Sequence, residues 1–154
     1  MRPGDQVVAS QLAGSFTLPR NTQRKLVFIA GGIGITPFRS MQDNLLERGE
    51  ARPITVLYGN NRIDEIAYAD ILKQAREELG IPTYYAVRDG SGATPDMTVG
   101  LVDEAMIRHR VPDFAERTFY VSGPQGMVSA TREVLLRMGI PHRRIKTDFF
   151  PGLA

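Results

Sequence analysis

The sequence predicts an α/β fold, a parallel sheet of five strands with helices on both faces. Three observations lead to this prediction. Strand-like and helix-like segments alternate from about residue 25 onward. The first strand candidate, KLVFIA at 25–30, is apolar on both of its faces, as a strand covered on both sides must be. Turns rich in Gly, Pro and Asn follow the strands, so crossover connections are expected, with the strands numbered along the chain in the order 3-2-1-4-5.

The strand candidates are short apolar or β-branched runs at 25–30, 53–59, 83–87, 118–123 and 144–150. Apolar residues at helical spacing predict helices after Pro37, over 64–79, over 99–109 and over 124–138. Residues 1–20 precede this alternation, with DQVVAS as a strand and AGSFTLP as a turn and exit. We therefore divide the chain into residues 1–20 and a nucleotide-binding domain at 21–154.

The composition of the chain excludes several kinds of functional site. A chain of 154 residues suits one domain, and it contains no cysteine, which excludes disulfides, cysteine-bound metals and thiol nucleophiles. His109 and His142 do not follow strands and are interpreted as surface residues, so no metal site is expected. The net charge of +2 does not argue for nucleic acid, and HRRIK at 142–146 is interpreted as a solvated surface. With no long apolar segment and no signal-peptide pattern, we expect a cytoplasmic protein or the cytosolic domain of a membrane-tethered one.

The segment GGIGITP at 31–37 must turn a strand into a helix. Gly32 and Gly34 have the G-x-G spacing, can adopt positive φ and leave room for a phosphate. Thr36 is expected to cap the helix and Pro37 to occupy its first position, so that free N–H groups favour an anion. A ligand-free turn is the alternative. If a pyrophosphate binds here, Gly34→Val should reduce binding far more than stability.

A second segment, YVSGPQGM at 120–127, repeats the pattern of strand, small-residue turn and helix. On the first and fourth strands, the two turns would face each other where the strand order switches direction. The pair resembles the NAD(P)H-binding domain of the ferredoxin–NADP reductase superfamily, over residues 26 to about 150. YGNNRIDEIAYADIL at 58–72 and TDFFPG at 147–152 are also similar to that family.

The resemblance implies a site at the ends of the strands. Its pyrophosphate-binding residues would be Gly32, Gly34, Thr36 and Pro37, with Asn60, Gly123 and Pro124 in the same pocket. Ser122 would orient the nicotinamide, although it could also cap the helix that begins at Pro124. Of the two terminal aromatics, Phe150 is expected to stack on a flavin, with Phe149 nearby and one of the two rings buried against the sheet. Met127 is interpreted as a core residue.

The family also implies a larger parent protein. Its FAD lies on a β-barrel ahead of the nucleotide domain; the Arg-x-Tyr-Ser/Thr signature of that barrel is absent, and residues 1–20 resemble only its last strand and exit loop. The expected function is therefore that of the NAD(P)H-binding part of an oxidoreductase that passes hydride to FAD and electrons to a protein, heme or iron–sulfur acceptor. The chain alone should be inactive. A nucleotide-sensing regulatory module and a phosphate-binding domain of unrelated chemistry remain alternatives.

The choice between NADH and NADPH stays open at this stage. Arg62 and Arg88 follow the second and third strands and could bind a 2′-phosphate, or they could be solvated. Asp64 and Glu65 oppose such a phosphate by their charge. We expect at most a slight tolerance of NADP.

Overall fold

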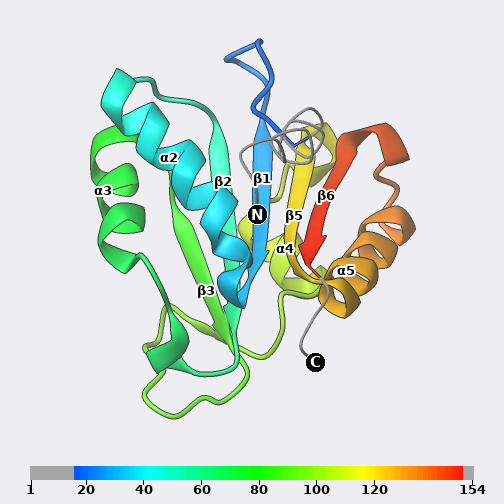
Figure 1. The fold of residues 1–154 in the computed structure, drawn as a ribbon. Helices are drawn as coiled ribbons and strands as arrows, with labels where there is room; N and C mark the ends of the chain where they lie inside the picture. Colours follow the sequence, from blue (N-terminus) through cyan, green and yellow to red (C-terminus); the bar gives the residue numbers. More distant parts are fainter. Residues whose placement is uncertain (1–15, 151–154) are drawn as a thin grey trace, which may run out of the picture.

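The computed structural model describes residues 16–150, and these form a single parallel sheet with helices on both faces (Figure 1). Within the described residues the sheet has six strands in the order β4-β3-β2-β1-β5-β6, and every neighbouring pair is parallel. Five of these strands are the expected ones, and their expected order 3-2-1-4-5 is confirmed as β3-β2-β1-β5-β6. The direction of winding changes at β1, whose neighbours are β2 and β5.

The elements follow one another in the alternation expected from the sequence. In chain order they are β1 Leu26–Gly31, η2 Gly32–Ile35, α2 Thr36–Arg48, β2 Ile54–Asn60, η3 Ile63–Glu65, α3 Ala69–Leu79, β3 Thr83–Val87, β4 Thr98–Val99, α4 Glu104–Arg110, η4 Phe114–Glu116, β5 Thr118–Pro124, α5 Gln125–Arg137, η5 His142–Arg144 and β6 Ile145–Phe150. The η elements are single turns of 3-10 helix.

Three elements differ from the prediction. The edge strand β4 was not expected, because its two residues lie at the end of a polar Gly/Pro loop and are too few to show a period. The helix expected over 64–79 is split: η3 forms first, Tyr68 adopts φ 59°, and α3 begins only at Ala69. The helix expected over 99–109 is α4, which begins at Glu104, where Asp103 accepts a hydrogen bond from the Met106 N–H at 2.9 Å.

Alternation along the strands divides the interior into two cores. Leu26, Phe28 and Tyr58 face the side covered by α2 and α3, and Phe28 stacks on Phe38 of α2 with ring centroids 4.4 Å apart. Val27 and Leu57 face the opposite side, which α4 and α5 cover. Both faces of β1 and β2 are therefore buried, as their continuous apolar runs predicted.

The segment 16–19 is packed onto the α2 side of the domain. Phe16 is buried between Phe38 and Tyr120, with ring centroids 5.6 and 5.3 Å away. The Tyr120 hydroxyl donates to the Thr17 carbonyl at 2.6 Å, and the nearly buried Arg52 donates to the Pro19 carbonyl at 2.6 Å. The strand proposed in DQVVAS lies outside the described residues.

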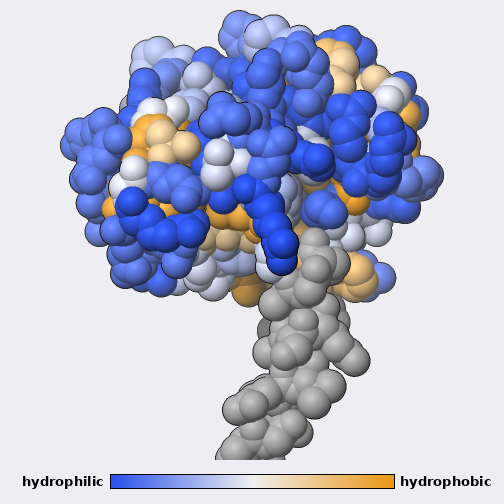
Figure 2. Space-filling view, turned by 90° about the horizontal axis from the view of Figure 1, so that it is seen from above, coloured by the Kyte–Doolittle hydropathy of each residue, from blue (hydrophilic) through white to orange (hydrophobic). Residues whose placement is uncertain are grey.

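The strands begin at one end of the sheet, and the surface there is largely hydrophilic (Figure 2). Part of the basic group at 142–146 has a structural use: Arg144 donates to the carbonyls of Ala115 and Arg117 at 2.6 and 3.3 Å. His142 pairs with Arg132 at 2.8 Å. Among the helices of residues 16–150, none combines the length and the apolar character needed to span a bilayer.

Candidate nucleotide-binding site

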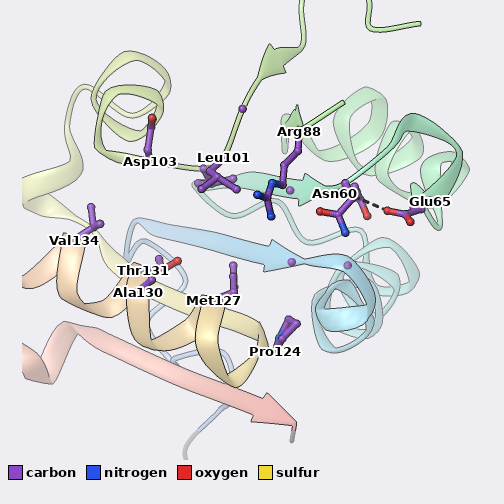
Figure 3. Close-up of a pocket in the computed structure, with 16 residues that line it drawn as sticks. Asn60, Glu65, Arg88, Leu101, Asp103, Pro124, Met127, Ala130, Thr131 and Val134 are labelled. Carbon is purple, nitrogen blue, oxygen red and sulfur yellow. Dashed lines mark hydrogen bonds between the residues drawn. The ribbon is translucent and has the colours of Figure 1, made fainter. Parts of the chain in front are cut away.

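A pocket of about 540 Å³ lies at the opposite end of the sheet, where β1, β2, β3 and β5 terminate. Its walls come from strand ends, from the loop after β4 and from one face of α5. Figure 3 shows Arg88 and Leu101 on one side of the pocket, with Met127, Ala130 and Thr131 of α5 on the other. The lining residues are Gly31, Gly32, Gly59, Asn60, Asn61, Glu65, Arg88, Gly100, Leu101, Val102, Asp103, Pro124, Met127, Ala130, Thr131 and Val134.

The glycine-rich turn after β1 forms the floor of the pocket. Gly32 has φ 54°, a conformation that favours glycine, and no atom lies within 4 Å of the position that a Cβ would occupy. Its backbone is therefore open to a ligand. Thr36 does not cap the helix as expected: η2 comes first, Thr36 is the first residue of α2, and its hydroxyl donates to the Ile33 carbonyl at 2.9 Å. Pro37 lies in the first turn of α2, as expected.

Gly34 does not have the role that the sequence predicted. It does not line the pocket, is buried and does not adopt positive φ. A Cβ at this position would stand 2.2 Å from the Ser122 carbonyl oxygen and 2.7 Å from the Gly123 Cα. Gly34 is needed so that η2 can pack on the backbone of β5. The expectation that Gly34→Val acts mainly on binding is therefore wrong, because the added side chain meets backbone before it meets a ligand.

The turn after β5 faces the turn after β1, as the two motifs predicted. Ser122 pairs with Ala30 of β1, is 1% exposed and does not line the pocket. It does not cap α5 either, since no side chain caps that helix and Pro124 holds the N-cap position. Pro124 lines the pocket. Gly123 lies beneath the Met127 sulfur, which would be 2.8 Å from a Cβ at that position.

Met127 packs on the core as expected and also lines the pocket. Its sulfur would stand 3.1 Å from a Cβ at Gly31, so this side chain lies over glycines of both motifs. The interpretation of Met127 as core alone was incomplete. Helical spacing could not show that the same side chain reaches the turn after β1.

The end of β2 brings amide and carboxylate groups into the pocket. Asn60 is 7% exposed, and neither atom of its amide has a hydrogen-bond partner among residues 16–150. Glu65 accepts a hydrogen bond from the Asn61 N–H at 3.2 Å (Figure 3) and another from the Arg62 N–H at 3.2 Å. The Arg62 side chain does not line the pocket and forms an exposed ion pair with Asp64.

Arg88 follows β3, lines the pocket and is exposed, and its guanidinium forms no ion pair with the described residues. The Ser91 N–H holds the pKa of the neighbouring Asp89 below its ordinary value. Beyond the loop, residues 100–103 form a wall of the pocket that the sequence did not indicate. The signal was weak because β4, which places this wall, has only two residues.

The two aromatic residues at the end of β6 lie beside the turn after β5. Phe149 pairs with Gly123 and is 52% exposed, whereas Phe150 pairs with Pro124 and is partly buried. Neighbours on a strand face opposite sides of the sheet, so the rings point to different faces. Neither is fully buried, so the expectation that one ring is buried against the sheet is not met.

The arrangement can bind an anion beside an apolar groove. The turn after β1 offers open backbone at Gly32, Arg88 offers a guanidinium for charge-assisted hydrogen bonds, and the Leu101 and α5 side chains offer apolar surface. A ligand with both phosphate and flat apolar rings fits this combination. Among the described residues, no group of three potential metal-ligating side chains comes together.

Solved structures share this fold. The FAD/NAD-binding domain of nitric oxide dioxygenase from Vibrio cholerae aligns with a TM-score of 0.77 and 25% identity, covering 89% of this chain and 54% of that one. An Amycolatopsis cytochrome P450 reductase aligns with a TM-score of 0.72 and 21% identity, covering 90% of this chain and 42% of that one. The second likeness concerns the fold alone.

Named proteins are similar to this chain in sequence. A flavohemoprotein of Halalkalibacterium halodurans is 29% identical over 96% of this chain and 37% of its own length. The reductase component of a propane 2-monooxygenase of Rhodococcus jostii is 28% identical over 98% of this chain and 42% of its own length. The chain thus spans about two fifths of the length of these relatives.

The family model described as the oxidoreductase NAD-binding domain matches residues 28–133, from β1 to within α5. The match includes both glycine turns and the strands that carry them, which confirms the resemblance drawn from the two motifs. The chain belongs to the oxidoreductase NAD-binding domain family, the nucleotide-binding part of ferredoxin–NADP reductase-like proteins.

Proposed function

We propose that this chain binds NAD(P)H for a flavoprotein oxidoreductase, in which hydride passes to FAD and electrons continue to a protein, heme or iron–sulfur acceptor. The observation that supports it best is the pocket at the switch point of the sheet, with open backbone at Gly32 and the guanidinium of Arg88, which forms no ion pair with residues 16–150. In open α/β sheets, ligands bind at such switch points. A cytoplasmic location belongs to the same proposal.

The residues present fit a dinucleotide. Gly32 and Arg88 would hold its pyrophosphate, Leu101 would contact the adenosine end, and Pro124 at the end of β5 would contact the nicotinamide end. The nicotinamide end would lie toward the end of β5 and Phe149. When bound, NAD(P)H supplies the hydride, and the protein sets its position.

Ser122 and Phe150 are proposed as positioning residues for hydride transfer. Ser122 is buried at the end of β5, so its hydroxyl would act only on a ring seated directly at Gly123. Phe150, one pair further along, would contact a flavin presented by the preceding barrel. The exposed apolar surface of Phe149 beside the turn after β5 supports this proposal over a sensing module, which would not need an exposed aromatic ring there.

Calorimetric titration of the chain with ADP, NADH and AMP tests the proposal. ADP and NADH should bind with similar affinity, and AMP more weakly, because most contacts would be to the pyrophosphate and adenosine. Gly32→Ala, which places a methyl group in the open backbone site, should reduce the affinity for ADP. Absence of ADP binding at millimolar concentration would contradict the proposed function.

A further inference from the structure

The pocket ends at the Met127 side chain. Its lining includes Gly31 and Pro124 but neither Ser122 nor Gly123. Met127 lies in the first turn of α5 and points toward β1 (Figure 3). Its Sδ atom stands 2.8 Å from the position of a Cβ at Gly123 and 3.1 Å from that of a Cβ at Gly31. The thioether therefore fills the space that these two glycines leave, and it separates the end of β5 from the pocket.

This position affects the two halves of a dinucleotide differently. Gly32 and Arg88, which would hold the pyrophosphate, line the pocket and are open to it. The nicotinamide end is placed at the end of β5, where Ser122 and Gly123 lie outside the pocket. Non-bonded heavy atoms need about 3.5 Å between them, so a ring seated at Gly123 and the Met127 sulfur would occupy the same space.

We propose that Met127 is a specificity-determining residue, which keeps a nicotinamide ring from the end of β5 until its side chain turns away. An adenosine diphosphate binds without this rearrangement, whereas the complete dinucleotide must displace the thioether from the glycines. Methionine suits such a position, because its unbranched side chain has three rotatable bonds and repacks readily. The inference rests on the proposed function, since it names the residue that limits one half of the same nucleotide.

The test is calorimetry with ADP and NADH on the parent chain and on Met127→Ala. The shorter side chain leaves the space at the glycines open, so NADH no longer has to reorder a methionine. The ratio of NADH affinity to ADP affinity should rise about fivefold above the ratio of the parent chain. The affinity for ADP should stay close to that of the parent chain, because Gly32 and Arg88 are unchanged.

Met138→Ala is the matched control. Met138 is the C-cap residue of α5, packs on the same core as Met127 and does not line the pocket. Both variants remove a partly buried methionine and should melt below the parent chain, but only Met127→Ala should change the affinity ratio. Met127→Leu nearly conserves volume and stability and lacks the Cε atom that stands 3.2 Å from a Cβ at Gly31, so it should raise the ratio about twofold.

Nuclear magnetic resonance of methionine methyl groups tests the parent chain itself, with the Met127 resonance assigned from its loss in Met127→Leu. Saturation with NADH should give this methyl group the narrow line of a mobile side chain, whereas ADP should leave its line width unchanged. Equal effects of NADH and ADP on that line overturn the inference.

The calorimetry can also overturn it in two ways. An affinity ratio in Met127→Ala or Met127→Leu equal to that of the parent chain would show that Met127 does not limit the nicotinamide end. A lower ratio would show that Met127 supports the ring instead of excluding it. If the parent chain binds neither ADP nor NADH, the proposed function itself fails, so the two failures are distinguishable.

Discussion

Gly34→Ala should damage the fold more than the nucleotide site. The ideal Cβ stands 2.2 Å from the Ser122 carbonyl oxygen and 2.5 Å from the Ser122 carbonyl carbon. Non-bonded heavy atoms prefer about 3.5 Å, so backbone must shift by about 1.3 Å at the junction of η2 and β5. Overpacking of this kind costs about 1–3 kcal/mol, and we expect about 3 because both neighbours are backbone.

That cost is a large part of a typical stability of about 5–15 kcal/mol. For a domain of this size it corresponds to a fall in melting temperature of about 6–12 °C, measured by circular dichroism. Gly32→Ala is the control, because its Cβ meets nothing within 4 Å and only the positive φ opposes it, at about 1–2 kcal/mol. Gly32→Ala should therefore melt closer to the parent than Gly34→Ala does. Its affinity for ADP should nevertheless fall further relative to its loss in melting temperature. A Gly34→Ala protein that melts within about 2 °C of the parent would refute this reasoning.

Three further predictions concern charge, pH and flavin. Arg88→Ala should weaken ADP binding about tenfold by calorimetry, because its guanidinium lines the pocket, whereas Arg62→Ala should leave both that affinity and the NADP/NAD ratio unchanged; equal effects of the two variants would remove Arg88 from the site. Burial raises the pKa of Tyr120 above its ordinary value near 10, so its contribution to stability is complete below that value and lost as pH rises through the raised pKa. Tyr120→Phe, which also removes the bond to Thr17, should cost about 1 kcal/mol at neutral pH and show a shallower alkaline decline in melting temperature; an unchanged decline would exclude Tyr120 as its source. The purified chain should be colourless and inactive toward dyes, and joined to the barrel of its parent it should turn yellow, with Phe150→Ala then altering turnover more than folding; stoichiometric FAD in the isolated chain would contradict this.

The sequence was a good guide to the sheet because its central strands β1, β2 and β5 are buried on both faces. Apolar runs over 25–30 and 83–87 needed no tertiary information, and the latter matches β3 at both ends. Helix starts were harder to predict, since they depend on local geometry: η2 displaced the cap from Thr36, and the αL conformation of Tyr68 interrupts the expected helix. Neither effect has a periodic signature.

The candidate site likewise contains residues that could be placed from the sequence and residues that could not. The segments after β1, β2, β3 and β5 could be placed at one edge of the sheet, because parallel strands end together. Residues 100–103 could not, since a strand of two residues sets their position. Asn60 is buried, and Arg62 pairs with Asp64 whereas Arg88 has no ion pair with residues 16–150. These tertiary facts cannot be predicted from residue spacing.

The glycines of the two motifs serve different purposes, and this changes how the motif pair should be interpreted. Gly31 and Gly123 make room for the Met127 side chain, and Gly34 makes room for the β5 backbone. Of the five glycines in the two motifs, Gly32 and Gly126 have open space where a side chain would be, and of these two only Gly32 adopts positive φ. Gly31, Gly34 and Gly123 therefore bring β1, β5 and α5 close enough to form a junction, and Gly32 exposes backbone at that junction. A sequence that kept Gly32 but lost Gly34 would keep the glycine that lines the pocket and lose the packing that holds it there. The spacing of the glycines therefore reflects packing directly, and it reflects the proposed ligand binding only through that packing.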